Sequence, residues 1–129
     1  GTPKTLDDLK DHKLLRYSFP GSSSLKLTDK ENQQHTLEIP DKMIANNGDF
    51  LKDMAVAGHG IVVTPTFIAW QAIATGDLVP ILKDYKLPQP NAYALYPQTR
   101  YLSQRARALI DFLVERFGDN PYWDQNLTI

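Results

Sequence analysis

The chain has 129 residues, 42% of them hydrophobic, which is enough to bury one modest core. Lysine and arginine number 14 against 15 aspartate and glutamate residues, so no basic surplus of the kind that binds nucleic acid is present. The absence of cysteine excludes disulfides and fits a reducing compartment, and no signal peptide or apolar run of membrane-spanning length is visible.

The first third of the chain combines one short helix with strand-like segments. Thr5 is placed to cap a helix over Leu6–Asp11, and the polar turn Asp29–Gln34 predicts a hairpin. Four strands are expected here: Lys13–Ser18, Leu25–Thr28, Thr36–Ile39 and Lys42–Ala45.

The central part is predicted to fold as helix, strand and helix. A stripe formed by Phe50, Met54 and Ala57 indicates the first helix, and Gly58 suits its left-handed C-cap. The β-branched run Ile61–Thr64 is too short for a helix and is expected to be a buried strand.

A second central helix is expected to open at Pro65 and to stop at Gly76. Leu78–Leu82 is then expected to form a strand, despite Pro80. Lys86–Pro90 contains two prolines and is the best internal boundary.

The C-terminal part is predicted to contain a strand and the strongest helix of the chain. Asn91–Tyr96 alternates like a strand, Ser103 is the expected helix cap, and Gly118 is the expected stop. The apolar stripe of this helix consists of Ala106, Ile110, Leu113 and Phe117. Trp70 and Trp123 are most simply core or interface residues. The alternation of strands and helices gives an α/β fold class.

The most informative segment is the turn Asn46–Asp49 with the strand that follows its helix. A turn at a helix start presents backbone N–H groups, and the amides of Gly48, Asp49 or Phe50 could hold a carboxylate-bearing ligand. The structural alternative is that Asn47 caps the helix, Gly48 relieves strain and Asp49 complements the helix dipole. Both interpretations remain open at the level of sequence.

No catalytic or metal-binding set is apparent. His12, His35 and His59 lie on separate predicted elements, and none has a partner at helical ligand spacing. The run Ser22–Ser24 lacks the glycines of a nucleophile elbow. We therefore expect a protein that binds a small molecule and is not an enzyme, with no cofactor and no metal.

The order of motifs from Thr5 to Asp119 resembles the later part of the effector-binding domain of LysR-type transcriptional regulators. The matching segments are Thr5-Leu6-Asp7-Asp8-Leu9 with His12, Asn47-Gly48, Ala57-Gly58-His59-Gly60-Ile61 with Pro65, Gly76-Asp77-Leu78, Tyr96-Pro97, Arg100 with Leu102-Ser103, and Ala108-Leu109-Ile110-Asp111-Phe112-Leu113. Each motif is weak alone, and their order and spacing make the match specific. His59 departs from the apolar residue usual between the two glycines.

The resemblance implies part of a two-lobed fold like that of type II periplasmic binding proteins. In this arrangement 1–85 form the second lobe, 86–90 form a crossover linker, and 91–129 return a strand and the closing helix to the first lobe. In the family a small effector lies between the lobes, and for this chain we expect the effector to be anionic. The positions implied to contact it are Asn46, Asn47, Gly48, Asp49, Phe50, Thr64, Pro65 and Thr66.

The resemblance also implies partners and a location. The family reads DNA through an N-terminal winged helix-turn-helix, which is absent from these residues, and its members are cytoplasmic dimers or higher oligomers. No membrane association is expected. Because most of the first lobe is also absent, the stripe of the last helix lacks its usual cover. We therefore expect the chain to self-associate, to swap this helix, or to fold it back on the remaining sheet.

Two rival functions share this fold. A solute-binding protein of a transport system would be distinguished by a secretion signal. An enzyme built on a related two-lobed fold is disfavoured because no acid, base or nucleophile converges. A structural interaction module is a further alternative.

Overall fold

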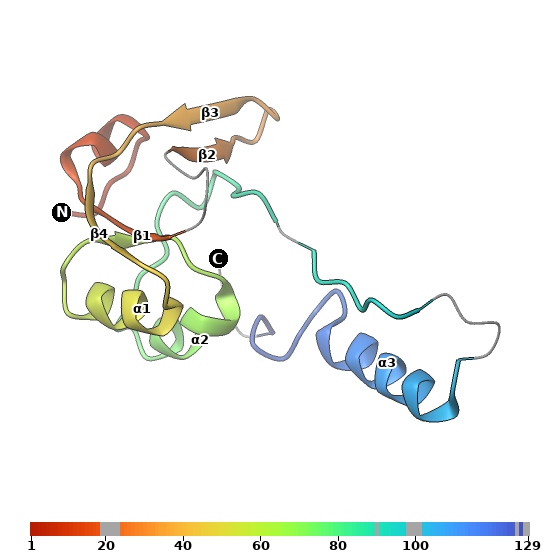
Figure 1. The fold of residues 1–129 in the computed structure, drawn as a ribbon. Coiled ribbons are helices and arrows are strands. Elements are labelled where there is room, and N and C mark those ends of the chain that lie inside the picture. The colour runs from red at the N-terminus through yellow and green to blue at the C-terminus, as the bar shows by residue number, and fades with distance from the viewer. Residues whose placement is uncertain (19–23, 90, 98–101, 126, 128–129) are drawn as a thin grey trace.

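The computed structural model describes residues 1–18, 24–89, 91–97, 102–125 and 127. It confirms a mixed α/β chain (Figure 1). In chain order the elements are the 3-10 helix η1 (Asp7–Asp11), β1 (Leu14–Tyr17), β2 (Leu25–Thr28), β3 (Gln34–Leu37), β4 (Asp41–Ala45), α1 (Gly48–Val56), β5 (Ile61–Val62), α2 (Thr66–Ala74) and α3 (Gln104–Phe117).

Three of the strands form a parallel sheet in the order β4-β1-β5. Leu15 in the central strand β1 lies opposite Met43 of β4 and Val62 of β5. The connection from β4 to β5 runs through α1 and passes across β1. Strands β2 and β3 form a separate antiparallel hairpin, as predicted.

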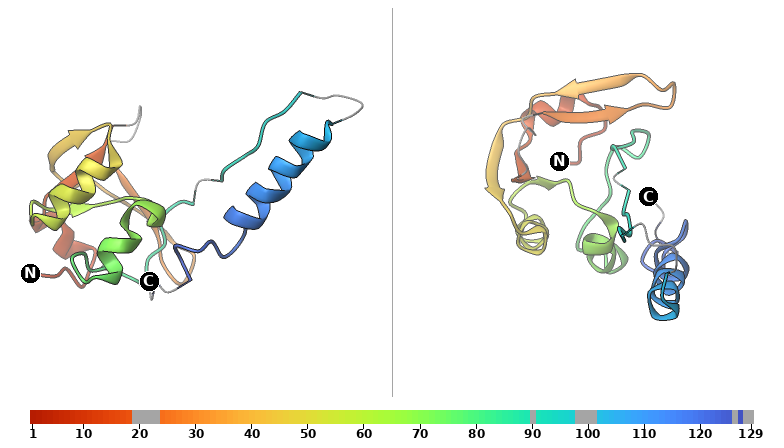
Figure 2. Two further views of the ribbon diagram at one scale, coloured as in Figure 1. Left: turned by 90° about the horizontal axis from the view of Figure 1, so that it is seen from below. Right: turned by 45° about the vertical axis from the view of Figure 1, so that its right-hand side comes forward.

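Both faces of the sheet are covered. Leu14 and Leu15 are successive strand residues whose side chains point to opposite faces, and both are buried. Figures 1 and 2 show α1 and α2 below the sheet and η1 with the hairpin above it. The buried apolar residues are Leu9, Leu14, Leu15, Leu27, Leu51 and Ala69.

The predicted helix ends are largely confirmed. The Asn47 side chain accepts a hydrogen bond from the amide of Phe50 at the start of α1, and Ser103 accepts one from Ala106 at the start of α3. Gly58 follows α1 with φ +78° and Gly76 follows α2 with φ +82°, which are left-handed conformations that glycine adopts without strain. The first helix differs, because it is a 3-10 helix that starts one residue later than expected.

The hairpin turn is organised by the Asp29 carboxylate. One oxygen accepts the amide hydrogens of Glu31 and Gln33 at 2.9 Å each, and the other lies 2.7 Å from Nε2 of His35. The ring of His35 packs edge-on against Tyr85, with 6.0 Å between ring centroids. The turn therefore joins the hairpin to the loop that follows α2.

We expect the hairpin turn to lose stability only in acid. The hydrogen bond from His35, followed by that from the Gln33 amide, lowers the pKa of Asp29 below its ordinary value of 3.8. A lowered pKa means that the stabilisation is present above 3.8 and is lost as the pH falls through the folded-state pKa. In a carboxyl NMR titration, His35→Ala should raise the pKa of Asp29. The pKa of Asp8, which backbone amides lower, should not move. An unchanged Asp29 pKa in His35→Ala would contradict this account.

Two predicted strands are wrong. Residues Leu78–Leu82 form a loop, since Pro80 has no N–H to donate and Leu82 has φ +51°, outside the β region. Asn91–Tyr96 pairs with no strand of the described chain, and its Leu95 side chain is 94% exposed. The alternation of apolar residues is present there, but a strand also requires a partner edge.

Helix α3 stands apart from the rest of the molecule (Figures 1 and 2). It contacts no other described helix or strand, and none of its residues is buried. The expectation that this helix folds back on the sheet is therefore wrong for this structure, while self-association and helix exchange stay predictions. Within the described residues, α3 and the other helices are too short or too polar to cross a membrane.

Candidate functional site

The candidate site lies at the edge of the sheet where the three parallel strands end. Strands β1, β4 and β5 end there at Tyr17, Ala45 and Val62. Both α1 and α2 begin just beyond that edge, because each follows a strand after a short turn. Ligands of open parallel α/β sheets commonly bind beyond the carboxyl ends of the strands.

The turn Asn46–Phe50 is open to solvent. Asn46 and Asn47 are exposed, Gly48 is half-buried, and the Asp49 side chain is 76% exposed with its carboxylate 3.8 Å from Lys52 Nζ. Asn47 Oδ1 accepts the Phe50 amide at 3.0 Å, whereas the amides of Gly48 and Asp49 have no acceptor among the described residues. The cap therefore uses one first-turn amide and leaves two without an acceptor in the described chain.

Gly48 has a different role from the strain relief that the sequence suggested. Its backbone is not in a positive-φ conformation. A Cβ at this position would lie 2.7 Å from Cδ1 of Ile68 in α2. Glycine therefore permits a close approach between the first residue of α1 and the first turn of α2. As a result, the N-terminal ends of the two helices lie side by side.

The segment Thr64–Thr66 forms the second part of the edge. Pro65 is the N-cap of α2 and provides no side-chain cap, while its carbonyl oxygen accepts the Ile68 amide at 3.1 Å. The Thr64 side chain places its Oγ1 in a buried position without a hydrogen-bond partner in the described chain. Buried hydroxyls without partners are unusual in folded proteins, and this one is covered by the chain's own atoms.

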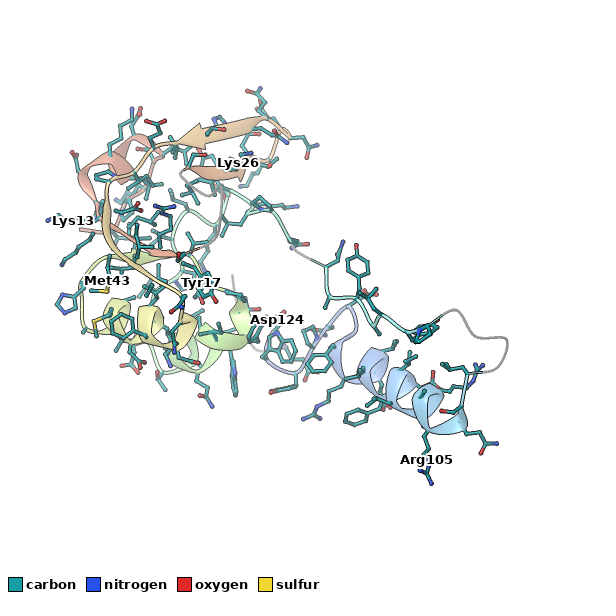
Figure 3. All side chains as sticks on the ribbon, viewed as in Figure 1. Lys13, Tyr17, Lys26, Met43, Arg105 and Asp124 are labelled. Atoms are coloured by element: carbon teal, nitrogen blue, oxygen red, sulfur yellow. The ribbon has the colours of Figure 1, made fainter. Side chains whose placement is uncertain are left out.

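The structure thus brings together the two segments that the sequence proposed for the site, while their role in binding stays a prediction. One further candidate was missed. Tyr17 ends the central strand and is 44% exposed. It shares the sheet face of Leu15, and Figure 3 shows it on the side of α1 and α2. Only the observed strand order, which places β1 between β4 and β5, identifies this residue as part of the edge.

The edge combines two helix N-termini with unpaired polar groups, and its described residues include no converging acid, base and nucleophile. Two helix N-termini give a positive partial charge, and unpaired amides and a hydroxyl can donate hydrogen bonds. His12 follows η1, His35 binds Asp29, and His59 is an exposed turn residue after α1. The histidines therefore do not converge on the edge. No cluster of potential metal ligands occurs in the described part of the chain.

Two surface hollows lie away from this edge. One of about 220 Å³ lies between α3 and the C-terminal segment, and another of about 250 Å³ lies beside the hairpin turn at Asp29, Lys30 and Tyr85. The residues of the sheet edge line neither of these hollows.

Comparison with known proteins identifies the relatives of this chain. Residues 1–118 match the family model described as the LysR substrate binding domain. The chain is 33% identical over 119 residues to the HTH-type transcriptional regulator PtxR of Pseudomonas aeruginosa, covering 88% of this chain and 38% of that protein. It therefore spans about two fifths of this relative's length.

Two solved structures have a similar fold. The regulatory domain of AphB from Vibrio vulnificus superposes with a TM-score of 0.73 at 25% identity, over 88% of this chain and 57% of that one. The regulatory domain of CrgA, a LysR-type transcriptional regulator from Neisseria meningitidis, superposes with a TM-score of 0.70 at 29% identity, over 92% of this chain and 58% of that one. The α/β architecture is thus that of a regulatory domain with a periplasmic-binding-protein-like fold.

Proposed function

Because the chain belongs to the LysR substrate-binding domain family, we propose that it is the effector-sensing part of a DNA-binding transcription regulator. Its ligand is a small anion, such as a carboxylate, bound at the carboxyl edge of the sheet. The observation that carries this proposal is the pair of first-turn amides at Gly48 and Asp49, which have no acceptor among the described residues and lie next to the first turn of α2.

Each group at the edge has a separate part in binding. The first-turn amides of α1 donate to one carboxylate oxygen, assisted by the partial positive charge of the helix. The Thr64 hydroxyl is covered in the free chain and donates only if its turn rearranges around the ligand, while Tyr17 offers an exposed aromatic surface. Because the Asp49 side chain is turned to solvent, its charge opposes a bound anion only weakly.

The wider assignment follows from the family. Residues 1–85 constitute the second lobe, 86–90 the crossover, and 91–129 the part that returns to the first lobe, whose remaining residues provide the opposite wall. The whole regulator works as a non-catalytic homodimer or higher oligomer in the cytoplasm and requires no cofactor. A transport solute-binding protein would share the fold, but the relatives are named as transcription regulators.

The test replaces Gly48 with proline, which removes one N–H donor with little change to the helix. Gly48 is the first residue of α1, a position where proline is favoured, and Asn47 before it is extended with φ −129° and ψ 114°. Binding of benzoate is measured by NMR chemical-shift changes at the edge. We expect Gly48→Pro to weaken it about tenfold, the effect of losing a hydrogen bond to a charged group.

Gly48→Ala is the matched control. It introduces the same contact with Ile68 as proline does, yet it keeps the N–H group. If both variants lose benzoate equally, the packing with α2 is responsible and the amide is not a ligand. Unchanged affinity in Gly48→Pro, or equal binding of uncharged benzamide, would overturn the proposed anion site.

A further inference from the structure

The C-terminal segment returns from α3 to the start of α2. After α3 the chain turns, and the amide of Asp124 donates to the Pro121 carbonyl at 2.9 Å. We call Pro121–Gln125 the strap. In Figures 1 and 2 the chain beyond α3 reaches back to α2, and Figure 3 places Asp124 beside the N-terminal end of that helix.

Trp123 of the strap contacts both helices. Its ring lies 6.1 Å from that of Phe67 in α2, in an edge-to-face arrangement. On the other side it lies 5.4 Å from the ring of Phe117, the last residue of α3. Such ring pairs add to the stabilisation that comes from burial alone.

Tyr122 repeats this arrangement one residue earlier. Its ring lies 6.1 Å from Trp70 in α2, and the Arg116 guanidinium of α3 lies 4.8 Å from the ring centroid. Each strap ring therefore touches one residue of each helix. The two rings also pack on one another at 4.9 Å. Since α3 contacts no other described helix or strand, these rings attach its C-terminal end to the rest of the molecule.

Two features oppose this attachment. Oδ1 of Asp124 is buried without a hydrogen-bond partner among the described residues, which is unfavourable for a carboxylate oxygen. In addition, an open surface hollow of about 220 Å³ lies between the strap and α3, so the contact between them is not continuous. The residues that line it are Phe112, Glu115, Arg116, Asn120, Tyr122 and Gln125.

We infer that the strap is a releasable clasp between α3 and the start of α2. The rings of Tyr122 and Trp123 hold it closed, and the buried, unpaired oxygen of Asp124 favours its opening. Phe67 directly follows the candidate site residues Thr64–Thr66, so the clasp fastens at the edge of the candidate site. Opening it frees α3 to move relative to the sheet. This inference concerns the chain without any ligand and does not depend on the proposed anion site.

The test compares two substitutions with opposite expected effects. Trp123→Ala should lower the hydrogen-exchange protection factor of the Asp124 amide about tenfold, because the ring contacts with Phe67, Phe117 and Tyr122 are all lost. Asp124→Ala keeps that amide and removes the unpaired oxygen, so its protection factor should rise about fivefold. Both tryptophans of the chain take part in the ring contacts of the clasp, Trp123 from the strap and Trp70 from α2, so in Asp124→Ala their fluorescence should also become less accessible to acrylamide.

The controls are Tyr93→Ala and Asp119→Ala, which change exposed residues outside the strap and should leave protection unchanged. Hydrogen exchange of the α1 amides checks that the sheet and its covering helices stay folded in each variant. If Trp123→Ala leaves the protection of Asp124 unaltered, no clasp exists. If Asp124→Ala lowers protection, Asp124 holds the strap closed and the releasable clasp is refuted.

Discussion

Replacing Gly60 with alanine is expected to destabilise the fold by about 3 kcal/mol, combining backbone strain with a weakened hydrogen bond. A Cβ on Gly60 would lie only 2.5 Å from the carbonyl oxygen of Lys13. That oxygen accepts the Ile61 amide at 2.9 Å, which begins the pairing of β1 with β5. The two backbones therefore have to separate to accept a methyl group. Urea unfolding followed by circular dichroism measures the loss.

Gly58→Ala provides the comparison, because it lies two residues away in the same turn. Gly58 has φ +78° but nothing within 4 Å of its Cβ position, so alanine there costs only the left-handed backbone penalty, about 1 kcal/mol. The sequence identified Gly58 as a helix cap and gave no role to Gly60, whereas the structure shows that Gly60 has the closer neighbour. Equal losses in the two variants would show that steric contact with Lys13 is not the cause.

Structural features that depend on residues close in sequence, such as helix caps and tight turns, could be predicted from the sequence. Asn47 and Ser103 cap their helices by bonding an amide three residues ahead, so type and spacing suffice to identify them. Gly58 and Gly76 stop helices through a conformation that glycine adopts readily. The hairpin was placed correctly for the same reason, although β3 starts two residues earlier than predicted.

Features that depend on distant partners could not be predicted. The strand expected at Asn91–Tyr96 has the right alternation and finds no neighbouring edge in the described chain. A Cβ on Gly48 would meet the end of the Ile68 side chain, a contact that only the packing of α1 on α2 reveals. Tyr17 joins the candidate site through strand order, since β1 lies centrally although it comes first in sequence.

In the candidate site, too, the residues could be predicted from the sequence but their spatial arrangement could not. The family's order of motifs pointed to Asn46–Phe50 and Thr64–Thr66 without indicating how they meet. Their meeting depends on the parallel order β4-β1-β5, which puts both turns at one edge, and on the close contact of Gly48 with α2. The unpaired hydroxyl of Thr64 is a property of the folded environment and has no sequence signal.

The stability of the chain is expected to reside in the sheet with α1 and α2, and Leu51→Ala tests this directly. Leu51 is 1% exposed on the face of α1 that packs on the sheet. Its truncation leaves a cavity and should cost about 3–4 kcal/mol. A domain of this size is stable by roughly 5–15 kcal/mol, so a large share of the folding free energy is lost. Urea unfolding at low protein concentration measures it.

Leu109→Ala is the matched control, since it makes the same change of side chain within a helix. Leu109 is 58% exposed on α3, so its truncation should alter the stability by less than about 1 kcal/mol in dilute solution. If the exposed face of α3 is covered by a second copy, the cost of Leu109→Ala should grow as the protein concentration rises, because association stabilises by mass action. The cost of Leu51→Ala should not depend on concentration. A large cost of Leu109→Ala in dilute monomer would show that α3 packs within its own chain, contrary to the structure.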